Sequence, residues 1–108
     1  MTIGSLRGEI VVKEDNEMII EVNGVGYRLQ VSATTYESSH IGQLETHFYI
    51  HHHFRENEQT LYAFLSRFEC KLFEALISAH KVGPSTRVVN SVNLWSRPTN
   101  TYRQFAGY

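Results

Sequence analysis

The stretch Lys81-Val82-Gly83-Pro84-Ser85, with Arg87 two residues further on, holds the residue types best suited to bind a phosphate group. A glycine followed by a proline at the end of a helical pattern predicts a sharp hairpin into a second helix, with Pro84 in its first turn. The free N–H groups at a helix start can bind an anion, and neighbouring cations add to the attraction. Helix pairs with a glycine turn are also common packing units, so both interpretations stay open. The candidate phosphate contacts are Lys81, Val82, Gly83, Ser85 and Arg87.

Histidines form the second set of residues that could do chemistry. His47, His51 and His53 alternate along one predicted strand and therefore share a face. A zinc site takes about four ligands with supporting groups behind them, and no convergent partner accompanies these histidines. We expect a histidine-rich strand, no metal and no other cofactor.

Cys70 is the one cysteine, which excludes an internal disulfide. It lies in a predicted helix without an evident histidine or aspartate partner, and we expect a core residue or a partly buried surface residue rather than a nucleophile. Because no Walker motif, carboxylate pair or glycine-rich phosphate loop is evident, we expect a chain that does not hydrolyse ATP. No apolar run reaches the roughly 18 residues of a membrane span, and a reducing, cytoplasmic setting is the expectation.

A helix has to position the predicted hairpin. Ser66-Arg67-Phe68-Glu69 is a capping-box pattern that would begin this helix, and the pattern ends near Ala79. Its members at helical spacing form one apolar stripe: Phe68, Leu72, Phe73, Leu76 and Ile77.

The chain changes character after residue 85. Residues 86–108 are rich in Asn, Ser, Thr and Arg and keep only a hint of helical spacing, in Val88, Val89 and Val92. A segment without a long apolar stripe has little to dock with. We expect a divergent or truncated tail that contributes little to the fold of residues 1–64.

The first half is predicted to form short strands. Two alternating apolar runs, residues 19–22 and 25–31, are joined by Asn23-Gly24, which suits the positive φ values of a tight hairpin turn. Gly26 marks a bulge or a place where another backbone comes close. Further strand patterns cover residues 6–13, 44–54 and 60–64, and the polar residues 34–40 form a helical turn or a loop.

Five or six antiparallel strands in about 64 residues favour a small closed barrel of the OB type, because closure removes exposed strand edges. We predict a mainly β fold with α-helices. Residues 1–64 form the barrel, residues 65–85 the first helix and hairpin of a helix-hairpin-helix domain, and residues 86–108 the tail.

The formal net charge of −1 hides an uneven distribution. Residues 1–64 hold four basic and nine acidic side chains, a balance of −5, whereas residues 65–108 hold six basic and two acidic ones, a balance of +4. An acidic half joined to a basic half indicates that a polyanion would be held by the second part and steered by the first. Two ordinary surfaces of opposite charge would give the same counts.

Taken together, the motifs occur in the order and spacing of the RuvA family, over residues 1 to about 85. The matching segments are Ile3-Gly4-Ser5-Leu6-Arg7-Gly8, Ile20-Glu21-Val22-Asn23-Gly24-Val25-Gly26-Tyr27, Arg55-Glu56-Asn57, Leu61-Tyr62-Ala63-Phe64, Leu72-Phe73 and Val82-Gly83-Pro84. The resemblance implies an OB-fold domain, helix-hairpin-helix DNA binding, a homotetramer on a four-way (Holliday) junction, and the motor ATPase RuvB as a partner in recombination and repair.

The family's acidic pin, two adjacent acids on a turn at the tetramer centre, falls on Glu56 and Asn57. Asn57 departs from the usual aspartate, and Lys81 stands where the family's hairpin usually has a glycine. The resemblance also implies a second hairpin and a RuvB-docking domain after residue 85, and neither is visible. Two other functions stay open: an OB-type single-strand binder and a metal enzyme that uses the histidines.

Overall fold

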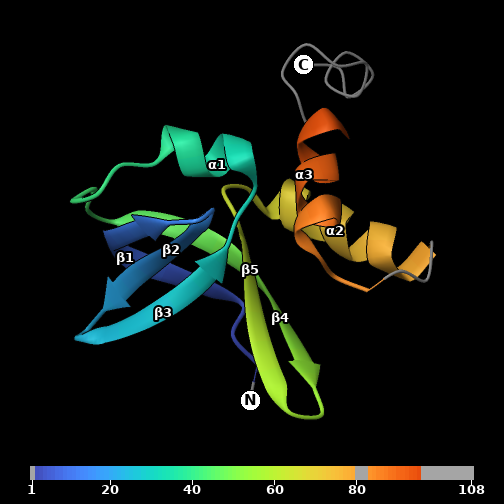
Figure 1. Ribbon diagram of the computed structural model, residues 1–108, viewed down its shortest axis with the longest axis horizontal. Helices are drawn as coiled ribbons and strands as arrows, with labels where there is room; N and C mark the ends of the chain where they lie inside the picture. Colours follow the sequence, from blue (N-terminus) through green and yellow to red (C-terminus); the bar gives the residue numbers. More distant parts are fainter. Residues whose placement is uncertain (1, 80–82, 96–108) are drawn as a thin grey trace.

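The computed structural model describes residues 2–79 and 83–95, with side chains as far as Val92. Five strands and a short helix come first, and two helices follow (Figure 1). In chain order the elements are β1 (Ser5–Glu14), β2 (Glu17–Val22), β3 (Val25–Gln30), α1 (Ala33–Ser38), β4 (Thr46–Arg55), β5 (Glu58–Phe64), α2 (Arg67–Ala79) and α3 (Thr86–Trp95).

The β2–β3 hairpin forms as predicted. Asn23 and Gly24 have φ values of 52° and 83°, so both central residues of the turn are left-handed. The ladder runs without a shift from Glu17↔Gln30 to Val22↔Val25. The expected bulge at Gly26 is therefore wrong.

The five strands close into a barrel in the order β1-β2-β3-β5-β4. The closing pair, β3 with β5, is parallel and short, whereas every other pair is antiparallel. The prediction of a closed OB-type barrel is confirmed, and this one parallel pair corrects its description as antiparallel throughout. Below the pairing of Leu29 with Leu61, β3 and β5 diverge (Figure 1).

Strand β1 turns the corner of the barrel. Its first residues pair with β4 and its later ones with β2, and the register shifts between Ile10 and Val12. A bulge of this kind bends a strand and raises its twist. Gly8 lies at the change of partner, where a Cβ atom would stand 2.2 Å from the carbonyl oxygen of Glu21. The close backbone approach is therefore at Gly8.

The barrel has its own core of side chains with at most 4% exposure. Its members come from all five strands and from the residue after β3: Ile10, Met18, Ile20, Leu29, Val31, Phe48, Ile50 and Ala63. Helix α1 covers one end, and Tyr36 packs against this core. The helical alternative for residues 34–40 is thus confirmed for residues 33–38.

A second core joins the helices to the barrel. Tyr62 and Phe64 of β5 pack with Cys70 and Phe73 of α2 and with two valines of α3. Those valines, Val89 and Val92, are each only 1% exposed. The expectation that the chain from residue 86 on lacks a stripe to dock is wrong for α3, because two buried valines one turn apart are enough beside an aromatic cluster.

A polar contact adds to this docking. The side-chain Oδ1 of Asn90 on α3 accepts a hydrogen bond from the backbone N–H of Ala33, 2.9 Å away, at the start of α1.

In the described part of the chain, no helix is long and apolar enough to cross a membrane.

Candidate nucleic-acid interface

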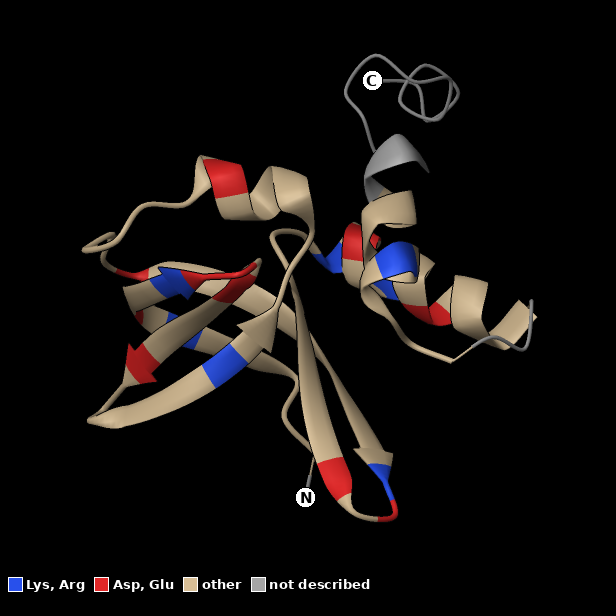
Figure 2. Cartoon of the chain, in the orientation of Figure 1, with Lys and Arg blue, Asp and Glu red and all other residues tan. Residues whose placement is uncertain are grey.

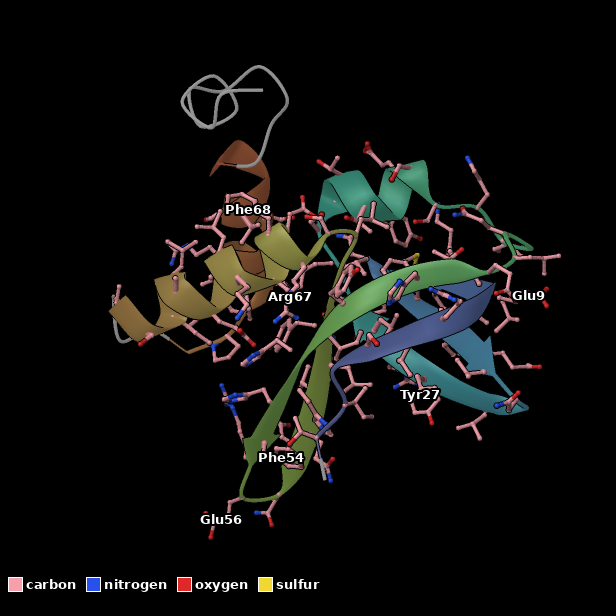
Figure 3. The ribbon with its side chains drawn as sticks, turned by 180° about the vertical axis from the view of Figure 1, so that it is seen from behind. Glu9, Tyr27, Phe54, Glu56, Arg67 and Phe68 are labelled. Atoms are coloured by element: carbon pink, nitrogen blue, oxygen red, sulfur yellow. The ribbon has the colours of Figure 1, made fainter. Side chains whose placement is uncertain are left out.

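The β4–β5 hairpin ends in a two-residue turn of Glu56 and Asn57, which follows the last rung, Arg55↔Glu58. Both turn residues are exposed. Figure 3 shows Glu56 at the far tip of the hairpin, directed away from the body of the protein. Because Glu56 projects from the hairpin tip, its carboxylate can contact a ligand or another subunit that does not itself touch the barrel.

The connection between α2 and α3 is the second candidate element. Helix α2 begins as the capping box predicts, because the backbone N–H of Glu69 donates to Ser66 Oγ over 3.1 Å. Lys81 and Val82 lie outside the described residues. Gly83 is exposed, whereas Pro84 is buried.

Ser85 begins α3 as its N-cap. Its Oγ accepts from the backbone N–H of Val88 over 3.3 Å, and its carbonyl oxygen accepts from Val89 over 3.0 Å. Pro84 therefore precedes the cap, and its expected place in the first helical turn is wrong. The Ser85 hydroxyl serves the cap, while the exposed Arg87 lies in the first turn. Gly83 and Arg87 are the described members of the predicted set that face solvent.

Phe73 fixes the position of α2 on the barrel. It is fully buried, and its ring centroid lies 5.2 Å from that of Tyr62 and 5.0 Å from that of Phe64. Aromatic pairs at this separation add to the free energy gained from burial. The β4–β5 hairpin that carries the acidic turn and helix α2 are thus packed against each other.

A histidine supports the same junction between strand and helix. His51 Nδ1 lies 2.9 Å from Glu74 Oε2 of α2, and the His51 and Phe73 ring centroids lie 5.4 Å apart with the rings inclined at 64°. Sequence reasoning missed this pair, because Glu74 is 23 residues away and nothing local links the two.

The other histidines of this strand have partners nearby. His52 Nδ1 accepts from the backbone N–H of Ile3 over 3.1 Å, which leaves Nε2–H to donate to Gln59 Oε1 over 2.8 Å. His47 Nδ1 lies 3.4 Å from Arg7 Nη2. Among residues 2–79 and 83–95, no three histidine, cysteine, aspartate or glutamate side chains are grouped so that they could hold a metal.

Cys70 is buried in the second core, as predicted. Burial, with a smaller contribution from the Glu74 carboxylate, raises the pKa of this thiol to about 11. The neutral thiol is therefore the form present at neutral pH, and it packs as an apolar group.

Both signs of charge occur on the barrel and on α2 (Figure 2). Acidic residues outnumber basic ones on the barrel and mark the tip of the β4–β5 hairpin, and basic residues lie at the starts of α2 and α3. The pattern places a negative turn and a positive helix start on the same molecule. Arg55 adjoins Glu56 and belongs to one of the family-matching segments, but the sequence did not identify it as a candidate binding residue.

A closed five-stranded barrel of the OB type that carries a docked helical pair belongs to a class in which oligonucleotide binding is common. The model of the RuvA N terminal domain matches residues 3–63. The chain therefore belongs to the RuvA N-terminal domain family.

Curated relatives agree with this assignment. The chain is 46% identical over 83 residues to the Holliday junction branch migration complex subunit RuvA of Shewanella sp. (strain MR-4), covering 76% of this chain and 40% of the relative. It is 43% identical over 83 residues to the protein of that name in Shewanella halifaxensis, with the same shares covered. For Chlorobaculum parvum the identity is 39% over 83 residues, covering 77% of this chain and 41% of the relative. The chain thus spans about 40% of the length of these relatives.

Proposed function

We propose that this chain is a DNA-binding subunit that recognises four-way (Holliday) junctions and supports branch migration in recombination and repair. The single observation that carries the proposal is the family match over residues 3–63, joined to relatives named as Holliday junction branch migration complex subunits. We also propose that the chain acts in the cytoplasm.

The division of charge supports a role for each half. Backbone phosphates of the DNA arms would lie against the α2–α3 connection, where Arg87 is exposed and the start of α3 favours anions. Contacts of this kind position a duplex without reading its sequence. The acidic turn would face the crossover, where phosphates of four strands crowd together.

We propose that four copies assemble on one junction, so that four Glu56 side chains surround its crossover. Repulsion between these carboxylates and the phosphates would favour an open junction over a stacked one. Because the second turn residue is Asn57, Glu56 supplies one carboxylate per subunit at the turn. We further propose that the subunit is non-catalytic and that RuvB, as the motor partner, hydrolyses ATP.

A second candidate is an OB-type binder of single strands. One observation favours it: a groove of about 480 Å³ opens where β3 and β5 diverge, and Tyr27, Arg28 and His52 are among its lining residues. An aromatic ring and a cation in a groove suit an unpaired base and its phosphate. The acidic barrel weakens this interpretation.

Competition binding separates the two functions. A labelled four-way junction is bound to the chain and then challenged with an unlabelled junction or with a single strand of the same sequence. Junction recognition predicts that the single strand competes at least tenfold more weakly. Equal competition would favour the groove between β3 and β5 as the binding site.

The acidic turn gives a testable pair of variants. Glu56→Gln removes four carboxylates from the proposed crossover and should tighten junction binding about two- to fivefold at low salt, whereas Asn57→Asp should loosen it by a similar factor. Both effects should shrink at physiological salt, because the Debye length is then only about 8 Å. Dissociation constants measured over a salt series check this.

Glu37→Gln is the matched control, since Glu37 is an exposed acid on α1, away from the hairpin. It should change affinity less than either turn variant. If Glu56→Gln weakened binding, or behaved like the control at low salt, Glu56 would be an ordinary turn residue.

A further inference from the structure

Arg55 lies between the two candidate elements. It is the last residue of β4, next to the acidic turn, yet its guanidinium reaches toward the α2–α3 connection. Arg55 Nη2 lies 3.5 Å from the position that a Cβ atom would take on Gly83. The arginine therefore reaches from the hairpin to a residue 28 positions further along the chain.

Two neighbours hold this side chain through one atom. Arg55 Nε donates to His53 Nε2 over 3.3 Å and lies 3.9 Å from Glu58 Oε1. The Glu58 pair is long and exposed, so it contributes little. Burial, followed by the charges of Arg55 and His51, lowers the pKa of His53, which favours the neutral imidazole that can accept this hydrogen bond.

Among the residues that the structure describes, the remaining donors of Arg55 have no partner and are open to a ligand. Its side chain is 54% exposed, and both the hydrogen bond to His53 and the pair with Glu58 use Nε alone. Guanidinium N–H groups in a planar fork match the oxygens of a phosphate. Because Gly83 is exposed and has no side chain, a phosphate can approach it closely and would then meet the guanidinium.

We propose that Arg55 is a DNA-phosphate contact that binds a backbone phosphate beside Gly83. This inference rests on the proposed function and adds a residue to its binding face. The β4–β5 hairpin then carries two opposite charges with separate tasks: Glu56 at the tip repels the crossover, and Arg55 at the strand end holds an arm of the junction.

A purely structural role for Arg55 predicts a different outcome. If the guanidinium only braces the hairpin against the α2–α3 connection, its removal would disturb the geometry but would not change how many counterions DNA releases on binding. The dependence of affinity on salt concentration separates the two roles, because each phosphate neutralised adds about 0.9 to the slope of log affinity against log salt.

The experiment compares Arg55→Gln, Arg55→Lys and Arg7→Gln with the parent, using a four-way junction over a salt series. Arg7 is the matched control, an exposed arginine on β1. We expect Arg55→Gln to weaken binding about tenfold at low salt and to make the slope shallower by roughly one for each phosphate that is no longer neutralised. Arg55→Lys should keep the slope and recover part of the affinity, and Arg7→Gln should stay within about twofold of the parent.

Two results would overturn the inference. Arg55→Gln could match Arg7→Gln, or it could bind more weakly with an unchanged slope and no recovery in Arg55→Lys, which would make Arg55 a brace. Equal binding of junction and duplex by the parent would instead refute the proposed function, and the slope of Arg55→Gln would still decide whether Arg55 contacts a phosphate. Circular dichroism of each variant identifies any decrease in affinity that comes from unfolding, and Arg55→Lys, which keeps the charge, then carries the test.

Discussion

Phe73→Ala should destabilise the docking of α2 and α3 by about 3–5 kcal/mol, the usual cost of removing a fully buried phenylalanine. The ring lies at the centre of the second core, against Tyr62 and Phe64, and is not a member of the barrel core. We expect the helices to lose protection in hydrogen exchange while the barrel strands keep theirs. Junction affinity should also fall, because Gly83 and Arg87 would lose their fixed positions relative to the barrel.

Phe68→Ala is the matched control on the same helix, since this phenylalanine is 37% exposed. It should cost about 1 kcal/mol or less, as expected for a side chain that is only partly buried. Equal destabilisation by the two substitutions would contradict a second core centred on Phe73. Simultaneous unfolding of strands and helices in Phe73→Ala would show that the two cores are one cooperative unit.

Gly8→Ala should destabilise the barrel itself by about 3 kcal/mol or more. A Cβ atom at this position would stand 2.2 Å from the carbonyl oxygen of Glu21 and 3.0 Å from its carbonyl carbon. Both are backbone atoms, so β1 and β2 would have to move apart where β1 changes partners. Thermal unfolding followed by circular dichroism measures this destabilisation.

Gly4→Ala is the control for that substitution. No atom lies within 4 Å of a Cβ built on Gly4, and its φ is not in the left-handed region. The control should keep the parent's melting temperature within a few degrees. If Gly8→Ala had the same melting temperature as Gly4→Ala, the fold would not require the close approach of β1 and β2.

Local patterns made much of this fold predictable. The Asn23-Gly24 turn and the capping box at Ser66 depend on residues close together in the chain, and both form as expected. The number and alternation of the strands were enough to predict a closed barrel, although the parallel pairing of β3 with β5 joins residues more than 30 positions apart.

The docking of α3 could not be predicted from its composition. Half of its ten residues are polar, and among the side chains described as far as Val92, Val89 and Val92 are buried in the second core with Val88 partly buried against it. Their burial depends on the cluster around Phe73, which forms only when β5 and α2 meet. Asn90 likewise bonds to Ala33, a residue 57 positions away.

Site prediction had a similar limit. The turn of Glu56 and Asn57 follows from a local pattern, and the structure agrees with it. Arg55 was missed because its significance comes from the neighbouring Gly83, which is brought close only by the docking of α2. The functional roles of these residues stay predictions until DNA binding is measured.

The most direct test of the central claim is the ratio of two dissociation constants, for a four-way junction and for a linear duplex of the same sequence, measured at one salt concentration near 0.15 M. Non-specific phosphate contacts are available on both DNAs, so only recognition of the crossover separates them. We predict junction binding at least tenfold tighter than duplex binding. Equal constants for the two DNAs would contradict the assignment of this chain as a junction-recognition subunit.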